Sequence, residues 1–498
     1  MKNLLKSLGL SITNSRTMLY SSVTDTTLPF TDEMFDAHIV EHTYKYGRGR
    51  IVFDQPVTEC GFWRDDKSWD NWELRRSIRS LVLPSELKVL RERALSDCHR
   101  LETIRLPKHL CEIGESAFSG CKKLISVWMS DSVVSIGDEA FCKCCELSQV
   151  RMSRQVTHIG NRAFYCCGFS RITLPERLKS IGYLAFAGSK LTELTLPESL
   201  KSIEECAFAQ CRHLTSYITI PNSVECIGDR VFEGCDKVAG FYGKHTSSDH
   251  RAIIVDGALK AFSSAGHPTI YAVTIPKGVT SIGESVFAKC FGLQEVTIPD
   301  GVKTIGRNAF DGCSQLSRVT IPDSVTSIEA CAFAGCHSLS SVKIPNRVTI
   351  IGAYAFVSCW RLRSVVIPAS VTTIGAFAFA GCERLQSLVI PDSVTLIERG
   401  AVGDCQLVVV GKHVKSMRDA FLTTRVSWQR IIVFTAPIGE GLGFEIPATK
   451  VYFPIDAMPS NTHCFRSCHH TSEVEVIGYH PSELESIVAS ELALIQSV

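Results

Sequence analysis

Apolar and polar residues follow one repeating pattern along most of the chain, usually with a period of about 23 residues. In one copy Val319 and Ile321 alternate with polar residues just before Pro322. Alternation with a period of two predicts a short half-buried strand, and proline ends it because proline cannot donate to a β-ladder. The proline recurs at Pro84, Pro107, Pro175, Pro197, Pro221, Pro276, Pro299, Pro322, Pro345, Pro368 and Pro391, with Ser130 and Ser153 in its place in two copies.

The rest of each copy predicts a second apolar segment, a sharp turn and a buried ring. Val325 and Ile328 follow Pro322, and in many copies a glycine comes next, where the chain must turn sharply. The A-F-x-G-C stretch from Ala332 to Cys336 then predicts a short helical turn that places its phenylalanine in the core. One copy cannot bury these residues alone, whereas stacked copies can, because each position meets its equivalent in the next rung.

Two columns of equivalent residues dominate the expected core. The aromatic column holds Phe118, Phe141, Phe164, Phe186, Phe208, Phe232, Phe287, Phe310, Phe333, Phe356 and Phe379, with Leu95 and Val402 near its ends. The cysteine column holds Cys98, Cys121, Cys144, Cys167, Cys211, Cys235, Cys290, Cys313, Cys336, Cys359, Cys382 and Cys405, with Ser189 in one rung. A buried free cysteine packs as a small hydrophobe, so we expect these thiols to be reduced and buried.

The combined motif, I-P-x-x-V-x-x-I-G-x-x-A-F-x-G-C, resembles the BspA-like leucine-rich repeat family in its 23-residue variant. The resemblance extends from about Leu81 to Phe421. It implies a right-handed leucine-rich-repeat solenoid of short parallel β-strands plus short helical turns, capped at both ends. Family members resemble adhesion and interaction proteins, so the resemblance implies a non-enzymatic role.

The pattern also divides the chain into three regions. Residues 1–75 form an N-terminal segment and cap, residues 76–421 the solenoid, and residues 422–498 a degenerate rung and C-terminal cap. Residues 246–271 interrupt the solenoid, and Asp256-Gly257 predicts a hairpin that leaves it. A terminal helix is expected after Ser482, with Leu484, Ile487, Val488, Leu492 and Ile495 on one face. Trp63, Trp69 and Trp72 fit either the cap or an aromatic recognition patch.

The charge and hydropathy of the chain limit which kinds of partner and which locations are expected. The chain has 52 basic and 51 acidic residues, a net charge of +1, which does not favour nucleic acid. No apolar run reaches the roughly 18 residues of a membrane span. Lys6 splits the short apolar stretch at the N-terminus, which argues against a secretory signal. We therefore expect an intracellular location, with a cell-surface or secreted one as the alternative.

One cluster of metal-binding residue types lies near the C-terminus: His463, Cys464, Cys468, His469 and His470. These types bind zinc, but no second pair stands at a standard distance. Phe465 and Cys468 keep the spacing of the repeat, so a degenerate final rung would explain these residues without a metal ion. No phosphate loop, nucleophile elbow or zincin motif occurs, and we expect neither catalysis nor a cofactor.

Function is expected at positions that the repeat leaves free. The residue two before the proline slot, here the outer column, should point away from the core. It reads Arg105, Trp128, Arg151, Thr173, Thr195, Thr219, Thr274, Thr297, Thr320, Lys343, Val366 and Val389. A tryptophan between two arginines on consecutive rungs resembles a binding hot spot, and Arg171 lies in the next column. Surface variation with cation–π stacking is the alternative.

These observations give one leading hypothesis and two alternatives. The leading hypothesis is a scaffold that binds a protein through the strand face, with Arg105, Trp128, Arg151 and Arg171 as the contact residues. A surface adhesin or glycan-binding protein is the first alternative, and a redox or zinc protein that uses the C-terminal cluster is the second. The threonines resemble ice-binding ladders, but the neighbouring column is mixed, with Arg171, Glu193, Glu295 and Arg318.

Overall fold

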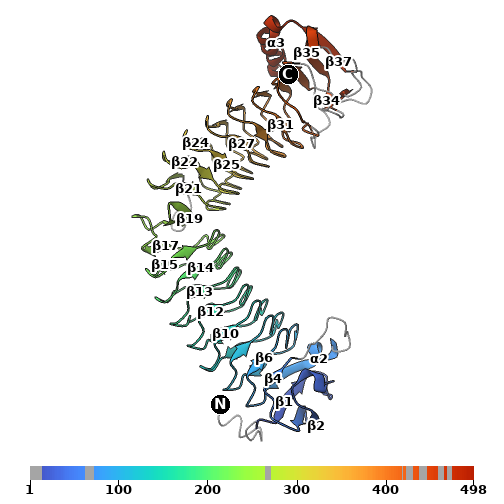
Figure 1. Ribbon diagram of the computed structural model, residues 1–498, viewed down its shortest axis with the longest axis vertical. Coiled ribbons are helices and arrows are strands. Elements are labelled where there is room, and N and C mark those ends of the chain that lie inside the picture. The colour runs from blue at the N-terminus through green and yellow to red at the C-terminus, as the bar shows by residue number, and fades with distance from the viewer. Residues whose placement is uncertain are drawn as a thin grey trace. The chain divides into compact units, whose positions relative to one another are not determined.

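The structure is a computed structural model that describes residues 14–61, 72–263, 271–417, 419–421, 430–436, 446–457, 465–467 and 474–497. The chain divides into two compact units, Met1–Ile253 and Ile254–Val498. Each unit is a stack of rungs built from short parallel strands (Figure 1). The predicted β-solenoid is therefore confirmed, while its handedness and its capping stay predictions.

The first unit has two long sheets and one strand pair. The sheet that carries the outer column runs β11(Gln149–Arg151), β9(Ser126–Trp128), β7(Thr103–Arg105), β5(Ile78–Val82), β1(Thr17–Ser22), β3(Arg48–Phe53) and β2(Ile39–Lys45). The other runs β16(Cys226–Ile227), β14(Ser202–Ile203), β13(Ser180–Ile181), β12(His158–Ile159), β10(Ser135–Ile136), β8(Glu112–Ile113), β6(Val89–Leu90) and β4(Glu59–Cys60). The pair is β15(Tyr217–Ile220) and β17(Gly240–Gly243).

The start of this unit departs from the repeat. β1 pairs antiparallel with both β3 and β5, and β2 pairs antiparallel with β3. The first repeat strand is thus joined to an antiparallel meander rather than left as an edge. The unit also contains η1(Asp32–Met34) and α2(Trp72–Ser77). Trp63 and Trp69 lie outside the described residues.

The second unit has two rows of short parallel strands of the same kind. One sheet runs β18(Ala252–Val255), β19(Ala258–Phe262), β21(Ser281–Ile282), β23(Thr304–Ile305), β25(Ser327–Ile328), β27(Ile350–Ile351), β29(Thr373–Ile374) and β31(Leu396–Ile397), and β18 spans the division between the units. The outer-column strands are β20(Ala272–Thr274), β22(Glu295–Thr297), β24(Arg318–Thr320), β26(Ser341–Lys343), β28(Ser364–Val366) and β30(Ser387–Ile390).

The insertion differs from the expectation that it would leave the solenoid. Asp256 and Gly257 do form a tight turn, with φ of 48° and 77°. The strand after that turn, β19, pairs in parallel with β21, so that Leu259 stands opposite Ile282. The expected excursion is therefore wrong for β19, because Leu259 fills the apolar slot that isoleucine fills in the repeats.

The phenylalanines of the aromatic column are buried and stacked on one another, as the repeat predicts. In the first unit the rings of Phe118 and Phe141 stack at 5.0 Å with an interplanar angle of 5°, and the stack continues to Phe232. In the second unit it runs from Phe287 to Phe379, with centroid distances of 5.1 to 5.6 Å. The ring separation matches the rung spacing, so each rung places one ring on the next.

The cysteine thiols make a specific contact in this core. The Sγ–H of Cys336 donates to the carbonyl oxygen of Phe310 at 3.3 Å, and that of Cys359 donates to Phe333 at 3.3 Å. The same bond, from a cysteine to the aromatic column one rung earlier, recurs at Cys144, Cys167, Cys211, Cys235, Cys313 and Cys382. Every described cysteine is free, and the described members of the cysteine column are buried except Cys290, which is half-buried.

The segment predicted as a short helical turn forms consecutive hydrogen-bonded turns. Ala117 N–H donates to Gly114 and Cys121 N–H donates to Phe118, both three residues earlier. Two positions in each turn, one before the alanine and one before the cysteine, have positive φ, as at Ser116 (54°) and Gly120 (75°). Glycine recurs at the second position because it adopts this conformation without strain.

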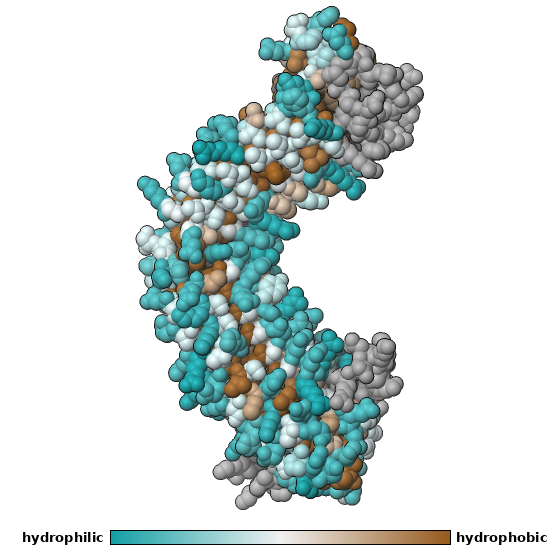
Figure 2. Space-filling model, viewed as in Figure 1, coloured by the Kyte–Doolittle hydropathy of each residue, from teal (hydrophilic) through white to brown (hydrophobic). Residues whose placement is uncertain are grey.

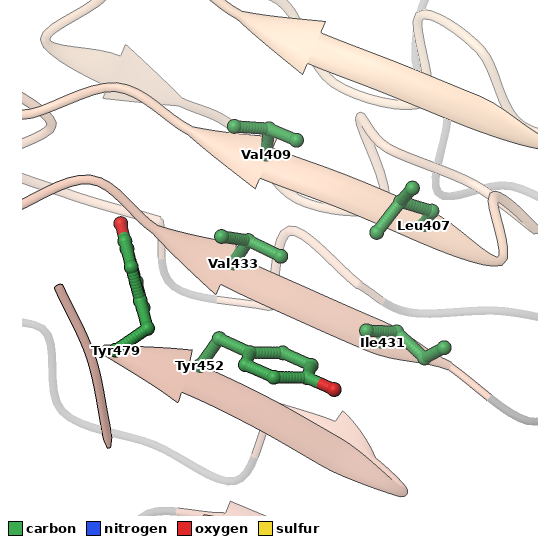
Figure 3. Close-up of a cluster of buried hydrophobic side chains, with 6 residues drawn as sticks. All are labelled: Leu407, Val409, Ile431, Val433, Tyr452 and Tyr479. Carbon is green, nitrogen blue, oxygen red and sulfur yellow. The ribbon is translucent and has the colours of Figure 1, made fainter. Parts of the chain in front are cut away.

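The end of the second unit keeps the parallel ladder without the repeat motif. β30 is followed in the sheet by β32(Leu407–Val410), β33(Ile431–Phe434), β35(Lys450–Pro454) and β37(Glu475–Tyr479), and β34(Ile446–Ala448) pairs with β36(Phe465–Ser467). The other helices among the described residues are η3(Ile455–Ala457), η4(Pro481–Glu483) and α3(Leu484–Ser497). Figure 3 shows the buried side chains of this sheet, Leu407, Val409, Ile431, Val433, Tyr452 and Tyr479. The apolar face of α3 packs on them through Leu484, Ile487, Val488, Leu492 and Ile495.

Candidate functional site

The outer column points to solvent along its whole length. Every one of its twelve predicted members is exposed, from Arg105 to Val389. Figure 2 shows one face of the molecule, on which hydrophobic residues lie scattered among mostly hydrophilic ones.

Three neighbouring strands of the first unit bring together the residues that the sequence singles out. β11 pairs with β9 so that Arg151 stands opposite Trp128, and β9 pairs with β7, which carries Arg105. Trp128 is 53% exposed, although most of its ring is apolar. The predicted order arginine, tryptophan, arginine therefore lies on adjacent strands of one exposed sheet face.

The two flanking arginines differ from most arginines nearby. Among the described residues, the side chains of Arg105 and Arg151 have no ion pair, hydrogen bond or ring contact. In contrast, Arg79 pairs with Glu102 at 3.1 Å and Arg162 pairs with Glu139 at 3.2 Å. Two unpaired guanidinium groups beside an exposed indole form a surface with spare donors and spare positive charge.

A hollow of about 680 Å³ begins at Trp128 and extends over the next three rungs. Its lining includes the apolar side chains Val150, Ile172 and Leu174. Arg151 and Arg171 also line it, together with Ser148, Gln149, Thr173, Glu176, Glu193, Thr195 and Pro197. An apolar lining mixed with charged and hydroxyl groups is the usual composition of a ligand or partner pocket.

The hollow lies where the outer-column sheet is interrupted. β11 is the last strand of its sheet, and residues 171–175 and 193–197 form no strand. The expectation that Thr173 and Thr195 lie on strands is therefore wrong, although both are exposed as predicted. Paired strands resume only at β15.

The sequence marks the place of this interruption. In most repeats the next apolar residue follows the column cysteine three positions later, as Leu147 follows Cys144. In two consecutive copies it follows two positions later, at Phe169 after Cys167 and at Leu191 after Ser189. In the first of these shorter turns a Cβ atom on Gly168 would lie 2.4 Å from the carbonyl oxygen of Cys145 in the previous rung. The two short turns directly precede residues 171–175 and 193–197, which form no strand.

Arg171 lies within the hollow, as its neighbouring column suggests, but it is not free. Its Nε lies 3.0 Å from an Oε of Glu193, and both side chains are largely exposed. An ion pair this exposed contributes little stability, about 0 to 1 kcal/mol. Arg171 and Glu193 therefore present a paired, overall neutral group, whereas Arg105 and Arg151 present positive charge.

The threonines do not form the regular double ladder of an ice-binding surface. Thr274, Thr297 and Thr320 stand in register on β20, β22 and β24. The neighbouring residues on β22 and β24 are Glu295 and Arg318, which stand opposite each other. A charged column beside the threonines breaks the flat hydroxyl array that such a function needs.

Comparison with known proteins gives the family. The family model of the BspA type Leucine rich repeat region (6 copies) matches residues 73–189, 157–248, 259–368 and 303–424. Together these ranges cover more than half of the chain. The chain belongs to the BspA-type leucine-rich repeat family. The BspA-type repeat is consistent with a protein-interaction or surface scaffold, and the family is not known for catalysis.

Solved structures with the same repeat are similar over most of their length. A leucine-rich repeat protein from Bacteroides ovatus is 27% identical, with 72% of this chain and 95% of that chain covered and a TM-score of 0.46. A leucine rich cell surface protein from Faecalibacterium prausnitzii is 24% identical, with 73% and 94% covered and a TM-score of 0.49. A leucine-rich repeat protein from Eubacterium ventriosum is 22% identical, with 61% and 82% covered and a TM-score of 0.46. A comparison with the curated proteins finds no match.

Other candidate sites receive no support from the described part of this BspA-type chain. There, no group of three or more His, Cys, Asp and Glu side chains is arranged to hold a metal ion. His463, Cys464, Cys468, His469 and His470 lie outside the described residues, so the zinc hypothesis stays a hypothesis. Among the described helices, none has the length and apolarity that a membrane span requires.

Proposed function

We propose that the chain is a non-enzymatic scaffold that binds a protein partner through the strand face of its first unit. The observation that carries this proposal is the hollow beside Trp128, which combines an exposed indole, an apolar lining and the unpaired Arg151. The unpaired Arg105 lies on the strand at the other side of Trp128. Tryptophan and arginine are the residue types that most often dominate interface energetics. Arg105, Trp128, Arg151 and Arg171 are the proposed contact residues.

The charge of the site specifies the chemistry of the partner. Arg105 and Arg151 lie two strands apart, about 10 Å at the usual strand spacing, with Trp128 between them. A partner with two carboxylates at that separation, and an apolar group between them, would satisfy both guanidinium groups and cover the indole. Because Arg171 is already paired with Glu193, it would contribute hydrogen bonds and packing more than net charge.

The proposal is tested by affinity capture from the native source, followed by mass spectrometry. The variant Arg105→Ala/Trp128→Ala/Arg151→Ala should lose the captured partner but keep its thermal unfolding midpoint, because exposed substitutions change stability by only about 0.5 kcal/mol or less each. The matched control is Thr297→Ala/Thr320→Ala/Lys343→Ala, which changes the same outer column in the second unit. An unchanged set of captured proteins with the first variant would contradict the proposal.

A further inference from the structure

A second group of exposed rings lies on the same strand face. Tyr217, on β15, is 51% exposed, and Tyr242, on β17, is 40% exposed. Their ring centroids lie 4.9 Å apart with an interplanar angle of 31°. The exposed His250 packs its ring against Tyr242, and the two ring centroids lie 4.5 Å apart. Three adjacent rings on a soluble surface are an unusual concentration of exposed apolar area.

The backbone of β17 holds one of these rings in place. Tyr217 stands opposite Gly240 in the strand pair, and a Cβ atom on Gly240 would lie 2.7 Å from Cε1 of Tyr217. The tyrosine ring therefore occupies the space that a side chain would fill. The carbonyl oxygen of His250 accepts a hydrogen bond from Phe241 N–H at 2.7 Å, which fixes the histidine beside the same strand. Contacts between β15, β17 and His250 thus hold the cluster together.

The cluster and Trp128 face solvent at opposite ends of the hollow. The hollow ends on the rung of Thr195, and Tyr217 belongs to the next rung. Tyr217 lies four rung spacings from Trp128, which is about 20 Å at the usual distance between adjacent strands. An extended peptide covers about 20 Å with six residues, since each residue adds about 3.3 Å.

We propose that the Tyr217–Tyr242–His250 cluster is a second anchor for the same partner, which lies along the hollow as an extended acidic segment. The segment would place carboxylates at Arg105 and Arg151 and an apolar side chain at Trp128. A second apolar or aromatic side chain, about six residues further along, would stack on Tyr217 and Tyr242. This inference rests on the proposed function, because it assigns the bound segment of that partner. The charge argument carries the choice of an acidic peptide, since the only unpaired cations described along this stretch of the outer column are Arg105 and Arg151. The lining beyond Arg151 holds the Arg171–Glu193 pair and Glu176, so the acidic residues of the segment belong at its Arg105–Arg151 end.

A phage library of random 16-residue peptides, selected on the full chain, tests the proposal. Enriched peptides should share an acidic pair around an apolar residue and carry an aromatic or large apolar residue about six positions away. Binding of a selected synthetic peptide should weaken at least about tenfold for Tyr217→Ser/Tyr242→Ser, the loss typical of a hot-spot contact. The variant Tyr217→Phe/Tyr242→Phe keeps both rings and should bind like the parent chain.

The outcomes separate the two proposals. Loss of binding with Arg105→Ser/Trp128→Ser/Arg151→Ser, but unchanged binding with Tyr217→Ser/Tyr242→Ser, would overturn the second anchor and leave the proposed function standing. Unchanged binding with the first of these variants would overturn both. Enriched peptides without acidic residues would overturn the assigned chemistry. Failure to enrich peptides, together with binding to a neutral oligosaccharide array that the tyrosine variant abolishes, would make the cluster a glycan site and overturn the peptide proposal.

Discussion

At the scale of the residue, the cysteine column combines two properties of a thiol. Cys313, Cys336 and Cys382 are small and buried, and each donates to the carbonyl oxygen of a phenylalanine one rung earlier. Burial raises the pKa of each of these three thiols well above its ordinary value, because the charged thiolate is poorly solvated in the core. The protonated form is therefore the one that the fold accommodates.

This shift predicts a loss of stability at alkaline pH. An ordinary thiol ionises near pH 8.5, so above that pH the unfolded chain releases protons while the folded chain keeps them. The contribution is fully present below about pH 8.5 and falls as the pH rises toward the folded-state pKa, by up to about 1.4 kcal/mol per pH unit for each thiol. Urea unfolding between pH 8 and pH 10.5 under reducing conditions measures the slope.

The matched control replaces two cysteines of the column with serine, which removes the thiols but keeps a small side chain at each position. Serine occupies this position naturally at Ser189, so Cys336→Ser/Cys382→Ser should keep the fold. The double variant should lose stability less steeply with rising pH than the parent chain, by up to about 2.8 kcal/mol per pH unit. An identical slope in the two proteins would show that these thiols do not ionise differently in the folded and unfolded chains.

At the scale of the element, the rung turn depends on residues with positive φ. The position before the column cysteine has a φ of 71° at Gly312, 65° at Gly335 and 70° at Gly381, but Ser358 occupies it with 58°. A residue with a Cβ atom in this conformation costs about 1 kcal/mol or more, which glycine avoids. The repeat tolerates the serine because the neighbouring rungs determine the turn.

Exchanging these residues should change stability in opposite directions. Ser358→Gly should raise the free energy of unfolding by about 0.5 to 1 kcal/mol, and Gly335→Ser should lower it by about 1 kcal/mol. Space is not limiting at Gly335, where the atom nearest to an added Cβ is 3.4 Å away. Chemical unfolding of both variants measures the effect, and a change of the same sign in both would refute the role of φ.

At the scale of the element, the sequence predicts part of the candidate site. The outward direction of Arg105, Trp128 and Arg151 follows from alternation along a strand, and the structure confirms it. The hollow does not follow from alternation, because it lies where strand pairing ends after β11. The short spacing from Cys167 to Phe169 coincides with that place in the sequence, but spacing alone does not predict whether neighbouring strands pair. The ring cluster was also missed, because His250 belongs to the insertion and reaches β17 only through tertiary contacts.

At the scale of the whole molecule, the two units share one repeat but present different outer columns. In the first unit the column carries the unpaired Arg105 and Arg151 around Trp128, followed by three threonines. In the second it runs from threonines through Lys343 to the exposed Val366 and Val389. The repeat maintains the core in both, so the difference lies only in positions that folding leaves free. A partner-binding role for one unit and not the other is therefore the central claim.

Site-specific photo-crosslinking tests this claim most directly. A photoreactive amino acid at Gln149, which lines the hollow, is compared with the same amino acid at Ser341, an exposed residue four before the proline slot in the second unit. With the partner captured by the parent chain, irradiation should give a covalent adduct from position 149 and none from position 341. An adduct from position 341, or none from position 149, would contradict the assignment of binding to the strand face of the first unit.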